Sequence, residues 1–286
     1  MAIIMDGKAL SAKIRANIKE ESAEFEKNTG IKPGLAVIIV GEDPASKIYV
    51  RNKGKACEEV GFKSEIYALP EETTESELLS LVHSLNERDD IHGILVQSPL
   101  PKHLDEALIV NNISAKKDVD AFHPVNVGKI MIGDYNFLPC TPAGVMELLK
   151  EYKIDPEGKK CVVVGRSDIV GKPMAMLLLH ANGTVTICHS RTRDLASITS
   201  DADILVTAVG KADFLKGDMV KEGAVIIDVG MNRNEEGKLT GDAVFAECEK
   251  KASYITPVPG GVGPMTITML MKNTLTAAKL SHAERI

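Results

Sequence analysis

The stretch that most constrains the fold runs from Cys161 to Pro173 and reads CVVVGRSDIVGKP. It begins with a short β-branched run that has no polar gap, which is typical of a strand covered on both faces of a parallel sheet. Gly165 allows a sharp turn where that strand ends, and Gly171 allows the following helix to pack close to the turn. Amides at the N-terminus of such a helix bind phosphate. The pattern therefore predicts a strand–turn–helix unit with the layout of a dinucleotide site.

The glycine spacing of this turn departs from the usual G-x-G-x-x-G pattern. Ser167 stands at the second glycine, and the last glycine comes late. An ordinary strand–turn–helix of an α/β domain is the alternative interpretation, and the next strand weighs against it. That strand, at 183–188, leads into the basic segment 189–193 (HSRTR). In an NAD site the corresponding strand ends in the Asp or Glu that binds the ribose 2′-hydroxyl.

The residues of this basic segment favour NADP over NAD. Hydroxyl and guanidinium groups attract a 2′-phosphate, which a carboxylate would repel. Ser190 and Arg191 supply such groups, and Arg166 and Ser167 on the neighbouring turn can join them. The alternative is that the basic cluster is a solvated loop.

Composition excludes several classes of protein. The 286 residues are 44% hydrophobic and 26% charged with a net charge of −6, which suits one or two folded domains and gives no reason to expect a nucleic acid or an anionic membrane as partner. No apolar run approaches the roughly 20 residues of a membrane span, and no signal-peptide pattern opens the chain. The 5 scattered cysteines form no Cys-x-x-Cys pair, which indicates reduced thiols and a cytoplasmic location. The 7 histidines show no ligand spacing, so we expect no metal.

Strands and helices alternate in the first third of the chain. This alternation predicts a parallel sheet with helices on both faces. The expected elements are a helix at 7–27, strands at 35–40, 64–69 and 91–97, and helices at 46–60 (capped by Ser46) and 74–88. We expect 98–101 to be a loop, because two prolines cannot sit in a central strand, 105–112 to be a short helix and 118–124 to be irregular. We place the domain boundary after residue 120. A helix with Thr141 as N-cap and Pro142 at its first position leads into the second domain.

The second domain, 121–269, is predicted to be a Rossmann-like dinucleotide-binding domain. Its further strands are expected at 202–210, 223–230 and 253–256. The carboxyl ends of such strands face one crevice, where ligands bind in open α/β sheets. A last helix, at about 265–280, closes the chain, and we expect 270–286 to return to the first domain, 1–120.

Tyr49 and Lys53 are the first candidates for chemistry. They stand at i and i+4, so they share one face of the predicted helix. Lysine ordinarily has a pKa of about 10.4, but burial can lower it enough for proton exchange near neutral pH. The alternative is a solvated lysine on a surface helix, since Lys47, Arg51 and Lys55 lie on the same helix.

Three further segments are candidates for ligand contacts. Gln97 lies at the carboxyl end of a predicted strand, where its amide can orient a water or a carbonyl, or make only a local hydrogen bond. Asp118 and Asp120 share one side of an extended segment and can receive a flat amidine-like edge, or they can cap a turn. The loop 257–264 is rich in glycine and proline, which lets backbone approach a ligand, or makes it a plain connector.

Motifs along the chain, taken together, resemble one family. They are YVRNK at 49–53, GILVQSPLP at 93–101, KDVD at 117–120, GRSDIVGKP at 165–173 and TPVPGGVGPMT at 256–266. In this order they resemble the bifunctional methylenetetrahydrofolate dehydrogenase/cyclohydrolases, the bacterial FolD family. The resemblance covers nearly the whole chain and shows no departure at these positions.

The resemblance implies two α/β domains facing a cleft, in a homodimer. It implies that the enzyme oxidises 5,10-methylenetetrahydrofolate with NADP⁺ and hydrolyses the 5,10-methenyl product to 10-formyltetrahydrofolate in the same site. Lys53 would be the catalytic lysine, positioned with the folate by Tyr49 and Gln97, and Asp120 would hold the pterin's amino edge. The resemblance also implies substrate contacts at Pro257, Gly260 and Gly261, and cofactor contacts at Gly165, Arg166, Ser167, Ser190, Arg191 and Met231.

A proton-transfer role for Lys53 agrees with the chemistry of the second reaction. The methenyl product is an electrophilic cation, so water attacks it without a metal. A neutral Lys53 can take a proton from that water and return it as the ring opens, whereas a charged one would repel the cation. We therefore expect a lowered pKa for Lys53 in the folate complex. Two alternatives stay open, an enzyme with only one of the activities and a non-catalytic NADP-binding regulatory protein.

Overall fold

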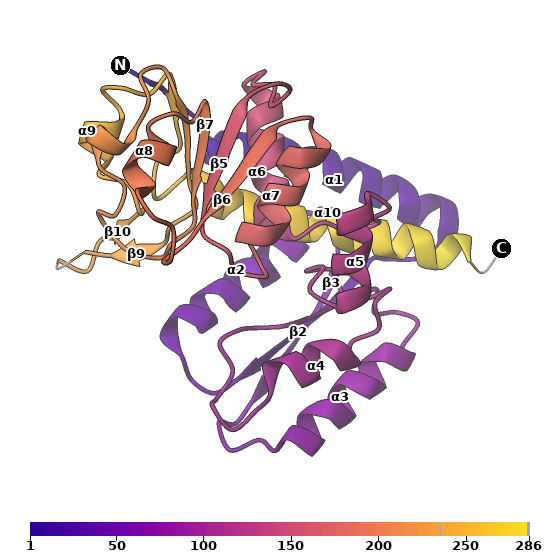
Figure 1. Ribbon diagram of the computed structural model, residues 1–286. Coiled ribbons are helices and arrows are strands. Elements are labelled where there is room, and N and C mark those ends of the chain that lie inside the picture. The colour runs from indigo at the N-terminus through magenta and orange to yellow at the C-terminus, as the bar shows by residue number, and fades with distance from the viewer. Residues whose placement is uncertain (235, 285–286) are drawn as a thin grey trace. The chain divides into compact units, whose positions relative to one another are not determined.

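The computed structural model describes residues 1–234 and 236–284, which form two compact units (Figure 1). Unit 1 comprises Met1–Ala12 and Pro139–Thr266, and unit 2 comprises Lys13–Leu138 and Ile267–Ile286. The chain therefore passes from one unit to the other near residues 12, 138 and 266, whereas the sequence predicted the main boundary after residue 120.

Buried amides explain why residues 121–138 belong to unit 2. Asn126 is 6% exposed, and its side-chain amide donates to Asp118 Oδ2 and to the Ala115 carbonyl at 2.8 and 2.9 Å. Asn273, in the last helix, donates to the carbonyls of Val119 and Leu138 at 2.7 and 2.8 Å. These side chains satisfy buried backbone acceptors on both sides of residue 120, so the chain does not leave the unit there.

Unit 2 is built on a 3-stranded parallel sheet in the order β3-β2-β4. Its strands are β2 (Gly34–Val40), β3 (Lys63–Leu69) and β4 (Gly93–Val96). Every residue of the central β2 is buried, as expected for an apolar run covered on both faces. The helices are α2 (Pro44–Glu59), α3 (Glu75–Glu87), α4 (Glu106–Asn112) and α5 (Pro124–Ile132), together with most of α1 (Gly7–Thr29) and α10 (Val262–Ala283).

Two features of these helices differ from the sequence-based expectation. Ser46 was predicted to cap α2, but the cap is Asp43, whose carboxylate accepts the Ser46 N–H at 2.7 Å. Pro44 fits the first turn because a missing N–H costs nothing there. The helix α5 was not predicted, and it begins at Pro124, where the segment 118–124 that was expected to be irregular ends, after a His123 cap.

Unit 1 is built on a 6-stranded parallel sheet in the order β1-β11-β8-β7-β5-β6. The helices α6 and α7 cover one face of this sheet, and α8 and α9 cover the other (Figure 1). The sheet consists of β1 (Ile3–Ile4), β5 (Lys160–Val164), β6 (Thr184–Cys188), β7 (Ile204–Thr207), β8 (Val225–Asp228) and β11 (Tyr254–Ile255). The helices are α6 (Cys140–Glu151), α7 (Gly171–His180), α8 (Leu195–Thr199), the 3-10 turn Gly217–Met219 and α9 (Phe245–Cys248).

Short elements of unit 1 were not anticipated. The strand β1 is only 2 residues long and pairs with β11, which places the start of the chain in this sheet. An antiparallel pair, β9 (Asn232–Arg233) with β10 (Leu239–Thr240), follows β8. Helix α6 begins at Cys140 after Pro139, one residue before the predicted Thr141 cap.

Candidate active site

Lys53 and Gln97, which the sequence singled out, lie against each other in unit 2. The Lys53 side-chain nitrogen donates to Gln97 Oε1 at 2.9 Å, and Lys53 is only 9% exposed. The Gln97 side-chain NH₂ donates to the Ser98 carbonyl at 2.7 Å, which fixes the amide so that its oxygen faces Lys53. The pair stands where α2 passes the carboxyl end of β4, so the solvated-lysine alternative does not hold.

Tyr49 lies one turn before Lys53 on the same helix and is half-buried. Burial raises the pKa of its phenol above the ordinary 10.0, so the hydroxyl keeps its proton at neutral pH and can donate a hydrogen bond. Cys57, one turn after Lys53, is fully buried, and burial raises its thiol pKa to about 12. A neutral thiol is a poor nucleophile, so the chemistry of this helix face falls to Lys53 and Tyr49.

Asp118 and Asp120 do not lie on the extended segment that was expected. The Ala121 N–H donates to the Asp118 carbonyl at 3.2 Å, so the chain turns there. The Asp118 carboxylate accepts from the His123 N–H and the Asn126 amide, both at 2.8 Å, and burial raises its pKa. Asp118 therefore stabilises the turn, as one of the alternatives proposed. Asp120 is half-buried, and its contact with a ligand stays a prediction.

The glycine turn after β5 has the close packing that the sequence indicated. Gly165 has a φ of +137°, and a Cβ there would lie 2.4 Å from the Ala208 carbonyl oxygen. A Cβ on Gly171 would lie 2.4 Å from the Gly165 carbonyl oxygen. The Ser167 hydroxyl accepts the N–H groups of Val170 and Gly171, each at 3.2 Å. The two glycines therefore allow close packing of the turn within unit 1, and contact of this backbone with a ligand stays a prediction.

Cationic groups stand beside this turn. The Gly165 N–H donates to the Cys188 carbonyl at 2.9 Å, which brings the turn next to the end of β6. Arg166, Ser190 and Arg191 are exposed there, and within the described ranges neither guanidinium has a hydrogen-bond or ion-pair partner. A glycine cradle with two uncommitted guanidinium groups fits a phosphate-bearing dinucleotide.

The loop after β11 packs closely against the start of α1. Gly260 has a φ of +109°, and its carbonyl accepts the Lys8 N–H at 3.0 Å. A Cβ on Gly7 would lie 1.8 Å from the Gly261 carbonyl oxygen. The glycines therefore serve packing within unit 1, while the substrate contacts of Pro257, Gly260 and Gly261 stay predictions.

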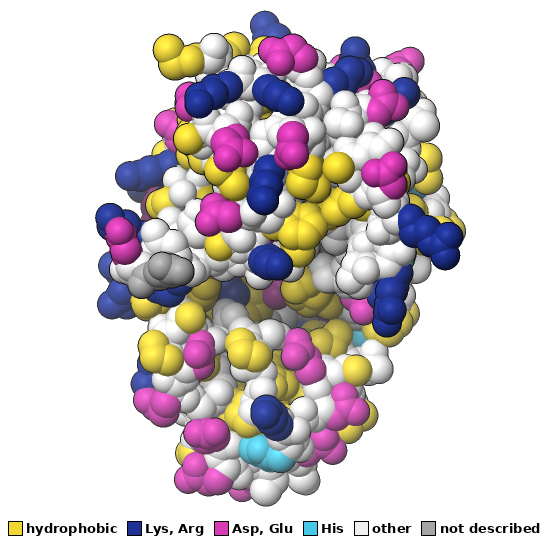
Figure 2. Space-filling view, turned by 60° about the vertical axis from the view of Figure 1, so that its left-hand side comes forward, with side chains coloured by type: hydrophobic (Ala, Val, Ile, Leu, Met, Phe, Trp, Pro, Cys, Tyr) yellow, Lys and Arg dark blue, Asp and Glu magenta, His cyan; other side chains and the backbone are white. Residues whose placement is uncertain are grey.

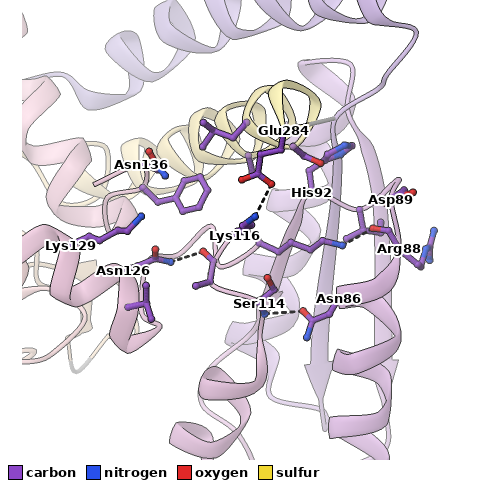
Figure 3. Close-up of a pocket in the computed structure, with 18 residues that line it drawn as sticks. Asn86, Arg88, Asp89, His92, Ser114, Lys116, Asn126, Lys129, Asn136 and Glu284 are labelled. Carbon is purple, nitrogen blue, oxygen red and sulfur yellow. Dashed lines mark hydrogen bonds and ion pairs between the residues drawn. The ribbon is translucent and has the colours of Figure 1, made fainter. Parts of the chain in front are cut away.

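A cavity of about 580 Å³ in unit 2 involves none of the predicted site residues. It lies between the end of α3, the turn at 114–117, α5 and the end of α10 (Figure 3). Lys116 and Glu284 form an ion pair of 2.7 Å at its edge, and Asn126 faces the same turn. We assign no part of the chemistry to this cavity.

The sequence analysis did not identify two buried carboxylates of unit 1 as candidate functional residues. Asp228 and Asp242 are 4% and 0% exposed. The signal for Asp228 was a charged residue that closes an apolar strand, whereas Asp242 stands in the polar segment Gly241-Asp242 and gave none.

No group of three or more His, Cys, Asp or Glu side chains that could hold a metal ion occurs in 1–234 and 236–284. Over the same residues, every helix is too short or too polar to cross a membrane.

Comparison with known proteins identifies the family. Two family models match: the tetrahydrofolate dehydrogenase/cyclohydrolase catalytic domain over residues 5–120, and the NAD(P)-binding domain of the same family over 139–282. The bifunctional protein FolD of Acetivibrio thermocellus is 62% identical over 98% of both chains.

Solved structures agree with this match. The FolD dehydrogenase/cyclohydrolase of Campylobacter jejuni superposes with a TM-score of 0.96 at 54% identity and covers 100% of both chains. The Trypanosoma brucei FolD, solved with NADP cofactor and an inhibitor, gives 0.95 at 42% identity over 98% of both chains. The chain therefore belongs to the tetrahydrofolate dehydrogenase/cyclohydrolase family.

Proposed function

We infer that this chain is a bifunctional enzyme of one-carbon metabolism. It oxidises 5,10-methylenetetrahydrofolate to the 5,10-methenyl form by hydride transfer to NADP⁺, and it hydrolyses that product to 10-formyltetrahydrofolate. Both domains of the family are matched along one chain, and the two solved structures described above are named as both dehydrogenase and cyclohydrolase. The observation that carries the inference is the buried Lys53–Gln97 pair beside Tyr49.

Lys53 transfers a proton in the hydrolytic step. Its amine takes one proton from the water that attacks the methenyl carbon and returns it to the ring nitrogen when the carbon–nitrogen bond breaks. The second proton of that water is released to solvent as the formyl C=O forms, so the cationic substrate gives a neutral product and one proton. Gln97 holds the Lys53 side chain by the 2.9 Å hydrogen bond, and the neutral Tyr49 phenol can donate to the folate. Asp120 receives the pterin's amino edge. Hydride transfer itself requires chiefly the orientation of the two reacting rings.

NADP is the proposed cofactor, with NAD as the competing choice. Gly165, Ser167 and the start of α7 would hold the pyrophosphate through backbone, and Met231 would contribute a backbone contact after β8. Arg166, Ser190 and Arg191 would hold the 2′-phosphate, and their exposed, uncommitted groups support that preference. The bound cofactor supplies the hydride acceptor.

One spectrophotometric experiment tests these proposals. Purified protein is mixed with 5,10-methylenetetrahydrofolate and either NADP⁺ or NAD⁺, and reduced nicotinamide and methenyl absorbance are followed together. We expect fast reduction of NADP⁺ with little accumulation of the methenyl compound. Faster reduction of NAD⁺ would contradict the roles of Ser190 and Arg191.

The same experiment separates the alternatives. Accumulation of the methenyl compound would indicate a dehydrogenase without an effective cyclohydrolase. If neither cofactor is reduced, methenyltetrahydrofolate is added directly. Its hydrolysis would then indicate a cyclohydrolase alone, and its persistence would indicate a non-catalytic NADP-binding protein.

We also propose a cytoplasmic homodimer that binds neither nucleic acid nor membrane. The net charge of −6 and the interspersed acidic and basic side chains on the face shown in Figure 2 support the absence of a polyanionic partner. All 5 cysteines are free and buried, which suits a reducing compartment. Light scattering should give roughly twice the 30.8 kDa of one chain, and cell fractionation should recover the protein with cytoplasmic markers.

A further inference from the structure

The buried carboxylate of Asp242 accepts hydrogen bonds from several backbone N–H groups of the loop that follows β7. Asp242 accepts the backbone N–H groups of residues 209–211 at 2.7, 3.1 and 2.9 Å. The Thr207 hydroxyl and the Asn232 amide donate to the same carboxylate at 3.0 and 2.9 Å. A fully buried charge is costly unless donors surround it, so this loop and Asp242 stabilise each other in a single arrangement.

A second carboxylate repeats the arrangement after β8. Asp228 accepts the N–H of Gly230 and the N–H groups of residues 242–243, each at 2.9 Å. Its own N–H donates to Thr256 Oγ1 at 2.7 Å, and Thr256 begins the loop that follows β11. Asp228 and Asp242 are therefore parts of one network that joins the segments after three neighbouring strands, β7, β8 and β11.

Two glycines leave space for these carboxylates. A Cβ on Gly230 would lie 2.3 Å from Asp242 Oδ1, and a Cβ on Gly241 would lie 1.9 Å from Asp228 Oδ2. Neither glycine has a left-handed φ, so the lack of a side chain, and not backbone freedom, is what these positions require. The glycines are an independent sign that close approach of the carboxylates is built into the sequence.

The segments that this network stabilises lie next to residues that are predicted to bind the dinucleotide. Ala208 directly precedes residues 209–211, whose N–H groups Asp242 accepts. A Cβ on Gly165 would lie 2.4 Å from the Ala208 carbonyl oxygen. The Ala208 N–H donates to the Val164 carbonyl at 2.8 Å, at the start of the glycine turn. Met231 directly follows Gly230. In open α/β sheets the ligand lies at these carboxyl ends, so a shift of either segment would change the shape of the cofactor site.

We propose that Asp228 and Asp242 are positioning residues for the dinucleotide. They hold residues 207–211 and 229–231 in the conformation that binds the cofactor, without touching it. The proposal rests on the proposed function, because it concerns NADP binding by unit 1. It predicts that loss of the Asp242 charge weakens cofactor binding and spares the hydrolysis of methenyltetrahydrofolate, which uses no dinucleotide.

The test compares Asp242→Asn with wild type and with Asp201→Asn. Asp201 lies in unit 1, pairs with Lys160 and has a side chain 60% exposed, so it controls for loss of one charge. Calorimetric titration with NADP⁺ should show a Kd about tenfold higher for Asp242→Asn, because a donor facing the new amide loses its acceptor. The KM for NADP⁺ should rise in parallel, while kcat and hydrolysis of added methenyltetrahydrofolate stay within about twofold. Asp201→Asn should match wild type.

Two outcomes overturn the proposal. One is an unchanged Kd for NADP⁺ in a variant that still hydrolyses methenyltetrahydrofolate. The other is an equal loss of both activities, which would indicate a general structural role. If Asp242→Asn is insoluble, Thr207→Val removes one donor to the same carboxylate at constant volume, and its Kd should rise about threefold. No change there would overturn the proposal equally.

The wild-type titration separates this proposal from the proposed function. Normal binding of NADP⁺ to wild type with unchanged variants overturns the positioning role alone. No binding of NADP⁺ to wild type overturns the proposed cofactor and, with it, the positioning role.

Discussion

At the scale of single residues, Lys53 carries the sharpest prediction. Replacing it with Met should lower cyclohydrolase turnover at least about 100-fold, the usual contribution of a general base. Lys55→Met is the matched control, since Lys55 is exposed on the same helix. Stopped assays with methenyltetrahydrofolate measure both variants. Full cyclohydrolase activity in Lys53→Met would refute the proton-transfer role.

Asp228 carries a prediction about pH. Burial raises its pKa from 3.8 to about 6, the Asp242 charge adds to the rise, and its backbone N–H donors oppose it. The folded chain thus holds this proton more tightly than the unfolded chain. The resulting stabilisation is complete below about pH 4 and is lost as the pH rises through about 6.

The Asp228→Asn variant isolates this contribution, since its side chain does not titrate. Between about pH 4 and pH 7, wild type should lose up to about 3 kcal/mol more unfolding free energy than the variant. Urea unfolding of both proteins at several pH values measures the difference. Parallel pH profiles would show that Asp228 titrates normally.

At the scale of elements, the junction between β5 and α7 is sensitive to one methyl group. A Cβ on Gly171 would collide with the Gly165 backbone, which cannot move as a flexible side chain can. Gly171→Ala should therefore weaken NADP⁺ binding at least about tenfold by calorimetry. Gly128→Ala is the control, because a Cβ at that helical glycine meets no atom within 4 Å. Equal affinities of the two variants would refute the close-approach argument.

The long elements were predictable because each has its own local signal. A few neighbouring residues are enough to predict each of them, as in the apolar runs of β2 and β5 and the glycines at 165 and 171. The strand β1 could not be predicted, since 2 residues carry no period and its partner β11 is distant in sequence. The Lys53–Gln97 contact was expected only through family resemblance, and the turn at Asp118 overrode its extended pattern.

At the scale of the whole molecule, neither unit is one continuous segment. Residues 1–12 belong with 139–266, and 267–286 belong with 13–138. The fragments 1–138 and 139–286 should each lack a cooperative thermal transition, because the first loses Asn273 and the second loses β1. Calorimetry of each fragment beside the full chain tests this. A cooperative transition of 1–138 near that of the full chain would refute it.

The pairing of β1 with β11 also governs how the chain folds during synthesis. Residues 3–4 leave the ribosome long before their partners at 254–255. At roughly 5–20 residues per second the interval is on the order of 10–50 s. The three strands of unit 2 have all emerged well before then, whereas this edge of the larger sheet stays open to other chains. Slower translation of residues 5–253 would lengthen that exposure, so the yield in the cell should depend on how quickly this part of the message is read.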